Sequence, residues 1–323
     1  MQRRSFIHAL TASALATSSN LHASGSSPQK VRVTLPSPGS AGSAWRPLID
    51  QLQLNQDPGL AIEWVVADPG KMQVQLSAGT LDVGVFGAAG LAMLVNRGSD
   101  IVLFGPALNN HGRWIVRAES PYKTPKDLVG KTIATTAETS ETYLQARIAA
   151  SLNGIDLKKD VKVIHGSPTA NLALFERGDV DAIITLEPTA TRLIGSGARE
   201  LARVADQWNA ATGGTEDPIL LGLAASRQWV NANKETARNI RDLFIKVNAL
   251  VRREPQHLTT IAQHMGLKAQ EEKAISLLPK RLAPAYATQW DAKTFAVLDK
   301  QVEVAAKLGI LTQVPAQKIY VQL

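Results

Sequence analysis

The most constraining feature of this 323-residue chain is an alternation of short β-rich runs with amphipathic helical segments. A strand-like run at 31–35 and a helical pattern at 141–153 belong to this series, which extends almost to Ala225. Alternation at this spacing is typical of an α/β fold with mostly parallel sheets. Beyond that point, apolar residues recur at the spacing of one helix face, as over 234–253. We therefore predict an α/β body that is completed by a helical C-terminal extension.

The sequence also repeats one pattern in its two halves. The segments 79–86 and 178–185 each begin with glycine, reach an aspartate three residues later and continue as a β-rich run. A glycine ends a helix in the left-handed conformation, and an aspartate favours the turn into a strand. Gly98 and Gly197 follow the two runs at matching distance. Two copies predict two similar lobes, with a ligand crevice where strand ends and helix starts face each other.

Composition excludes several classes of protein. The chain has 35 Lys and Arg against 28 Asp and Glu, a net charge of +7, but the basic residues are scattered and only 5% of residues are aromatic. This is typical of a solvated surface rather than of a nucleic-acid interface. Cysteine is absent, which excludes a disulfide framework and cysteine-based metal sites or nucleophiles. Because no zinc-type His-Glu-x-x-His, phosphate-binding loop or Gly-x-Ser-x-Gly is found either, we expect no nucleic-acid partner, metal, cofactor or enzyme activity.

Residues 1–25 read as an export signal. Arg3 and Arg4 are followed by Ser-Phe-Ile and by a mildly apolar stretch rich in Ala, Ser and Thr, which is too short to span a membrane. The Arg-Arg-x-Phe-Ile pattern resembles a bacterial twin-arginine signal, and an ordinary Sec signal is the alternative. In both cases the signal is cleaved and the protein is exported.

Four stretches resemble the periplasmic solute-binding proteins of ABC importers, in the branch that binds nitrate, sulfonates, taurine and pyrimidine precursors. They contain Gly-Thr-Leu-Asp-Val-Gly, Asp-Leu-Val-Gly-Lys, a helix that ends in glycine, and Gly-Asp-Val-Asp-Ala with a following Glu-Pro, and they lie at 76–87, 124–134, 143–154 and 175–188. Their order and spacing carry the resemblance, which covers roughly 31–197.

The resemblance implies a type II periplasmic binding protein fold, with two lobes that are each a mostly parallel sheet flanked by helices. We expect lobe 1 to comprise 30–111 and 220–323, including the C-terminal helices, and lobe 2 to comprise 112–219. The two crossovers between the lobes are expected near 110–114 and 217–221.

The implied function is capture of a small organic anion, such as an alkyl or aryl sulfonate, taurine or a nitrate-like ion, between the lobes. The closed form then docks on the membrane permease of an ABC importer, because the ligand favours closure. Two alternatives stay open: import of a pyrimidine or thiamine precursor, and an exported sensor that presents its closed form to a receptor kinase. We expect a periplasmic monomer.

Candidate ligand-binding residues lie in loops that follow strands and begin helices. Small residues in the loops 36–45 and 87–90 let backbone N–H groups approach a ligand. The hydroxyl-rich stretch 136–142 resembles the helix start that receives the anionic head in the family, although a helix N-cap explains one such hydroxyl. The candidates are Ser37, Ser43, Trp45, Gly87, Ala88, Asn110, His111, Thr139, Ser140, Thr142, Ser167 and Glu187.

Several candidates have a second interpretation. Trp45 either stacks on a ligand or packs at the start of a helix, and His111 bonds either a ligand or a neighbouring loop. Glu187 either accepts from an amine or stabilises a helix start. Glu138 and Glu141 depart from the family pattern, because a carboxylate suits a helix N-terminus but repels a sulfonate. They either point outward, or the ligand is neutral or cationic.

Overall fold

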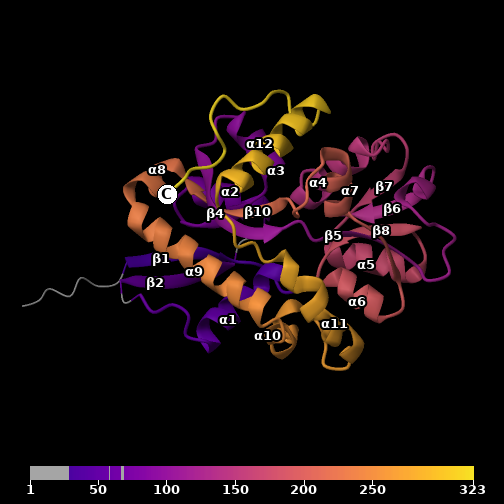
Figure 1. The fold of residues 1–323 in the computed structure, drawn as a ribbon, viewed down its shortest axis with the longest axis horizontal. Coiled ribbons are helices and arrows are strands. Elements are labelled where there is room, and N and C mark those ends of the chain that lie inside the picture. The colour runs from indigo at the N-terminus through magenta and orange to yellow at the C-terminus, as the bar shows by residue number, and fades with distance from the viewer. Residues whose placement is uncertain (1–28, 58, 67–68) are drawn as a thin grey trace, which may run out of the picture.

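The structure is a computed structural model and describes residues 29–57, 59–66 and 69–323. The expected export signal at 1–25 lies outside the described residues. The chain folds into two lobes, which lie side by side in Figure 1. Among the described residues, no helix combines the length and the apolar character needed to cross a membrane.

Lobe 1 holds the sheet order β3-β10-β4 and the parallel pair β1-β2, which a parallel bridge between Val33 and Val83 connects to β3. Its strands are β1 (Gln29–Leu35), β2 (Leu60–Val66), β3 (Gly84–Phe86), β4 (Ile101–Asn109) and β10 (Ile219–Ser226). Its helices before the crossover are η1 (Ala41–Ala44), α1 (Trp45–Gln51), α2 (Pro69–Ser77) and α3 (Ala88–Val95).

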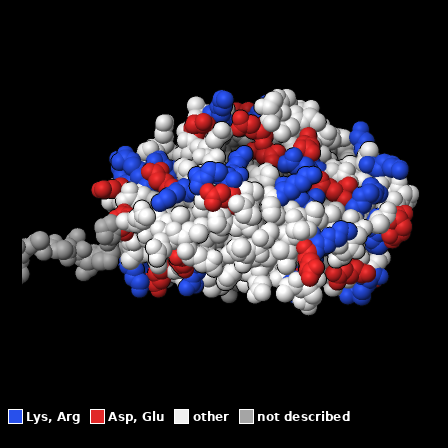
Figure 2. Space-filling model, turned by 60° about the horizontal axis from the view of Figure 1, so that its bottom comes forward, with Lys and Arg blue, Asp and Glu red and all other residues white. Residues whose placement is uncertain are grey.

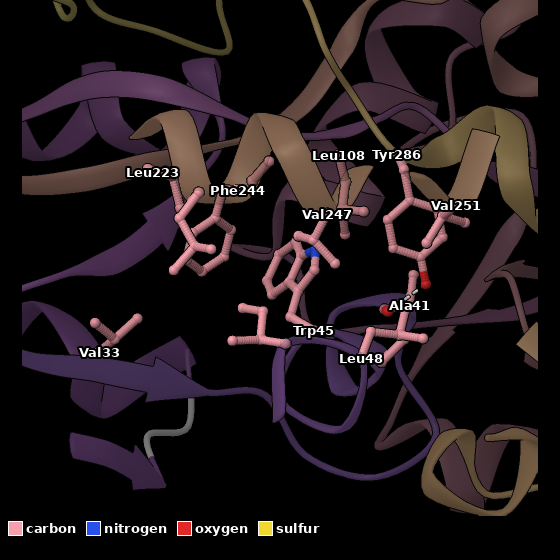
Figure 3. Close-up of a cluster of buried hydrophobic side chains, with 14 of the residues drawn as sticks. Val33, Ala41, Trp45, Leu48, Leu108, Leu223, Phe244, Val247, Val251 and Tyr286 are labelled. Carbon is pink, nitrogen blue, oxygen red and sulfur yellow. Dashed lines mark hydrogen bonds between the residues drawn. The ribbon is translucent and has the colours of Figure 1, made fainter. Parts of the chain in front are cut away.

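The C-terminal part of lobe 1 is helical, as the periodicity after Ala225 predicts. It contains α8 (Arg227–Ala232), α9 (Lys234–Arg253), α10 (His257–Thr260), η3 (Ala262–Met265), α11 (Glu272–Leu282), η4 (Ala283–Ala285) and α12 (Ala292–Lys307). The apolar face of α9 packs onto the lobe 1 core, where Phe244 and Val247 surround the Trp45 ring (Figure 3).

Lobe 2 is built on the sheet order β7-β6-β8-β5-β9. Its elements are β5 (Gly112–Val116), η2 (Pro125–Leu128), β6 (Thr132–Thr135), α4 (Glu141–Leu152), β7 (Lys162–His165), α5 (Pro168–Arg177), β8 (Ala182–Leu186), α6 (Thr189–Gly195), β9 (Arg199–Arg203) and α7 (Val204–Thr212).

The sheets are more mixed than the sequence predicts. The pairs β1-β2, β6-β7 and β6-β8 are parallel, whereas β10 runs antiparallel to β3 and β4, and β5 runs antiparallel to β8 and β9. The antiparallel pairs therefore involve β5 and β10, the strands on which the chain enters lobe 2 and returns from it. A strand that arrives from the other lobe does not have to follow the direction that a βαβ unit imposes.

The internal repeat is confirmed as a helix–turn–strand junction in each lobe. Gly79 and Gly178 have positive φ angles of 66° and 82°, and Gly98 and Gly197 have positive φ angles of 87° and 101°. The two expected crossover segments lie against each other, since the Asn110 N–H donates to the Pro218 carbonyl at 2.7 Å. We keep 112–219 as the proposed extent of lobe 2.

Charge is distributed over both lobes. On the face shown in Figure 2, Lys and Arg side chains are interspersed with Asp and Glu, and the middle of this face is largely uncharged. This face therefore presents no broad expanse of one sign.

Candidate functional site

The predicted loops gather at the ends of parallel strands. In lobe 1 the loops 36–44 and 87–90 follow β1 and β3, and in lobe 2 the residues after β6, β7 and β8 carry the remaining loop candidates. Neighbouring parallel strands end at the same edge of a sheet, so the candidates form one group in each lobe.

Helices α3 and α4 bring these two groups together. Glu141, the first residue of α4, reaches across to the start of α3. Its Oε2 accepts from the Gly90 N–H at 2.9 Å and its Oε1 from the Ala89 N–H at 3.3 Å. Gln145 donates its Nε2 to Oε1 at 2.9 Å. We call this arrangement the Glu141 contact.

Gly87 makes the Glu141 contact possible. A Cβ added at this glycine would lie 2.0 Å from the Glu141 Cδ, so no larger residue fits while the carboxylate is in place. Burial raises the pKa of Glu141, while the hydrogen bonds from Gln145, Gly90 and Ala89 oppose that rise. At Gly87, where a small residue is predicted to let a ligand approach, the group that lies close in this structure is the Glu141 side chain.

The hydroxyls beside Glu141 have mixed roles. Ser140 is the N-cap of α4, since its Oγ accepts from the Tyr143 N–H at 3.3 Å and lies 2.6 Å from the Thr136 Oγ1. Thr139 is exposed and Thr142 is partly buried at the same helix start. Glu138 has a half-exposed side chain and pairs with Lys158.

The residues between β4 and β5 make hydrogen bonds that hold the crossover between the lobes. Asn110 donates its Nδ2 to the Gln145 Oε1 at 2.6 Å, and its own Oδ1 accepts from the Gly112 N–H at 2.9 Å. His111 is 2% exposed, and its Nδ1 donates to the Asn109 carbonyl at 2.8 Å. Burial lowers the pKa of His111 to about 4, so its ring is neutral at pH 7. Asn110 is thus bonded to α4 and to the start of β5, and His111 is bonded to the end of β4.

Of the two interpretations of Trp45, the structure supports packing at the start of a helix. Trp45 is 1% exposed, its ring packs edge-on against Phe244 at 5.0 Å between centroids, and its Nε1 donates to the Asn248 Oδ1 at 3.0 Å. The indole is therefore part of the lobe 1 core and does not stack on a ligand. The physical reason is that Trp45 is the first residue of α1 and that the apolar side chains of α1 pack against α9. This packing buries the indole, which is the largest side chain of the helix.

Of the two interpretations of Glu187, the structure supports the helix-start carboxylate. Glu187 is 1% exposed, and its Oε2 accepts from the Thr191 N–H at 2.8 Å, as a helix-start carboxylate does. Its Oε1 accepts from Arg281 at 2.8 Å and lies 3.4 Å from the Arg113 Nε. Arg281 also donates to Glu200 at 2.6 Å. We call Arg113, Glu187, Glu200 and Arg281 the Arg281 network, and its charges balance.

The serine candidates differ in exposure. Ser37 is exposed in the loop after β1, and its carbonyl accepts from the Ser40 hydroxyl. Ser43 is buried, with its Oγ 2.7 Å from the Ser40 carbonyl and 2.9 Å from the His264 carbonyl. Ser167 is the N-cap of α5. Ser37 is thus accessible to a ligand, whereas Ser43 is committed to the C-terminal helices.

Sequence reasoning missed several residues at these contacts. Gln145 follows Glu141 by four residues on one helix, a spacing at which side chains meet, and this signal was available. Arg281 is 94 residues from Glu187, and no local pattern links them. Buried hydroxyls of Thr34 and Thr135, at the ends of β1 and β6, have no hydrogen-bond partner. Among the described residues, no cluster of His, Asp and Glu is placed to hold a metal ion.

Comparison with known proteins places this architecture among transport proteins. The family model for "ABC transporter, phosphonate, periplasmic substrate-binding protein" matches residues 35–274. An ATP phosphoribosyltransferase of Solidesulfovibrio magneticus is 29% identical over 70% of each chain, and the taurine-binding periplasmic protein of Escherichia coli is 26% identical over 49% of each. The alkanesulfonate-binding protein from Xanthomonas axonopodis pv. citri, solved bound to MOPS, has a TM-score of 0.73 and 20% identity over 92% of this chain and 99% of that chain.

Proposed function

Because this chain belongs to the ABC transporter periplasmic substrate-binding family of the phosphonate type, we propose that it captures a small organic oxyanion between its two lobes and delivers it to an importer permease. The oxyanion class covers alkyl and aryl sulfonates, taurine, phosphonates and nitrate-like ions. We further propose that the protein acts as a periplasmic monomer, is exported through the signal at 1–25, and does not catalyse a reaction.

This proposal rests on the hydrogen bonds that the first residues of α3 make to a carboxylate. The N–H groups of Ala89 and Gly90 already hold a carboxylate, that of Glu141, at hydrogen-bonding distance. A helix N-terminus favours anions through its free N–H groups and its dipole. A site that holds a carboxylate in this way has the donors that a sulfonate or phosphonate head requires.

The acidic residues do not support a basic ligand. Glu138 pairs with Lys158, and Glu187 belongs to the charge-balanced Arg281 network. Glu141 accepts from α3 and from Gln145. The carboxylates that favoured an amine or aminopyrimidine ligand therefore have partners inside the protein, and the organic oxyanion is the better-supported class.

A thermal-shift panel tests this function. We expect stabilisation by at least one of ethanesulfonate, taurine, methylphosphonate and nitrate, because a ligand at 100 times its Kd stabilises the folded state by about 2.7 kcal/mol. Bicarbonate and a hydroxymethylpyrimidine serve as comparison ligands. A flat response to every compound would contradict the binding function, and a response to the pyrimidine alone would replace the ligand class. Permease and ATPase genes beside this gene would support import, whereas a kinase gene would support sensing.

A further inference from the structure

Glu141 lies where a ligand head is expected. Its carboxylate belongs to lobe 2 but is bound by backbone donors of lobe 1, and residue 141 as a whole is partly exposed. The Glu141 Cγ and Cδ fill the space in front of Gly87, each 2.0 Å from where a Cβ would stand. A ligand oxyanion and this carboxylate therefore compete for the same donors and for the same volume.

Helix α3 carries the N–H donors and helix α4 carries Glu141, and packing between the two helices holds both in place. Beneath the Glu141 contact, Leu144 and Ile148 of α4 share a buried apolar cluster with Leu91 of α3 and Leu298 of α12. Because that packing holds the two helices together, the carboxylate can exchange by rotation of its own side chain while the helices stay in place.

We propose that Glu141 determines ligand specificity as a built-in competitor, whose carboxylate holds the α3 N-terminus until a ligand oxyanion displaces it. This inference rests on the proposed function, since it takes the ligand head to be an oxyanion. A weak anion cannot displace a carboxylate that is tethered in place at high effective concentration. The site therefore selects ligands whose organic part adds further contacts in the cleft.

Gln145 connects the competition to the crossover between the lobes. Its Nε2 donates to Glu141 and also to the Ile219 carbonyl at 2.9 Å, and its Oε1 accepts from Asn110. Displacement of Glu141 leaves this amide with one fewer partner at the place where both crossover segments meet. Gln145 is thus the residue through which occupancy of the site reaches the crossover.

Titration calorimetry with ethanesulfonate and with inorganic sulfate tests the proposal on four proteins: wild type, E141A, E141Q and E138A. We expect E141A to bind the anion that wild type binds at least tenfold more tightly, because the N–H donors are then free. E141Q keeps the side-chain volume but presents an amide to the α3 donors. We therefore expect its affinity for the anion to lie between those of wild type and E141A. E138A is the matched control, because it removes the same charge three residues earlier, from a side chain that pairs with Lys158. Its affinity for the anion should stay within about twofold of wild type.

The outcomes separate the two proposals. Tighter binding by E141A with unchanged E138A supports the competitor role. Equal or weaker binding by E141A, while wild type binds, overturns it and leaves the proposed function standing. Absence of binding of both anions by all four proteins overturns the competitor role, and the thermal-shift panel then decides whether the oxyanion ligand class stands. If E141A fails to fold, the E141Q affinity decides, and equal or weaker binding than wild type then overturns the proposal.

Discussion

Two of the contacts between the lobes are built on opposite principles. The Glu141 contact holds one carboxylate with uncharged donors, namely the N–H groups of Ala89 and Gly90 and the Gln145 amide. Helix α11 of lobe 1 lies beside α6 of lobe 2 (Figure 1). The Arg281 network joins α11 to lobe 2 through ion pairs whose charges balance. A ligand anion can take the place of a carboxylate that is held only by uncharged backbone N–H donors. In the Arg281 network each carboxylate already has an arginine partner, so no group there is available to a ligand anion. We infer that the first contact serves binding and the second serves stability.

Breaking the Arg281 network should give the largest effect. R281M leaves Glu187, a fully buried carboxylate, with less compensation, so we expect a loss of about 3 kcal/mol in the free energy of unfolding. Urea denaturation measures this loss. K280M, at the exposed neighbouring position, is the control and should change stability by less than about 0.5 kcal/mol. Equal effects of R281M and K280M would contradict a stabilising role for the network.

A side chain at Gly87 should expel the Glu141 carboxylate. Because the added Cβ overlaps the Glu141 Cδ, we expect G87A to destabilise the protein by about 2 kcal/mol. In the E141A background the same substitution has room, so its cost should nearly vanish. A double-mutant cycle by urea denaturation measures this coupling. Additive costs would show that the two residues do not compete for the same space.

A smaller effect should distinguish the two contacts by pH. Burial raises the pKa of Glu141 above its ordinary value of 4.5, so the folded state binds this proton more tightly than the unfolded state. Stability therefore contains a contribution that is complete below pH 4.5 and is lost as pH rises through the raised pKa. E141Q cannot ionise and should lack this decline, while R281M should retain it. Parallel stability profiles for wild type and E141Q would contradict the assignment.

The sequence predicts the two-lobe fold and its local turns better than it predicts the side-chain contacts between the lobes. The glycine-aspartate repeat predicts two lobes because positive-φ glycines and turn aspartates act locally. The N-cap at Ser140 is predictable for the same reason. Partners across the lobes are not predictable in this way: Glu141 binds donors 51 and 52 residues away, and Glu187 binds an arginine 94 residues away. Trp45 shows the same limit, since the position of α9 determines whether its indole is buried in the core or faces a ligand.

We propose above all that the start of α3 binds the ligand's oxyanion in place of Glu141. A crystal structure of the protein with ethanesulfonate tests it most directly. We predict sulfonate oxygens within hydrogen-bonding distance of the Ala89 and Gly90 N–H groups, with the Glu141 side chain rotated away from Gly87. A sulfonate bound elsewhere in the cleft, with Glu141 still on α3, would contradict the claim.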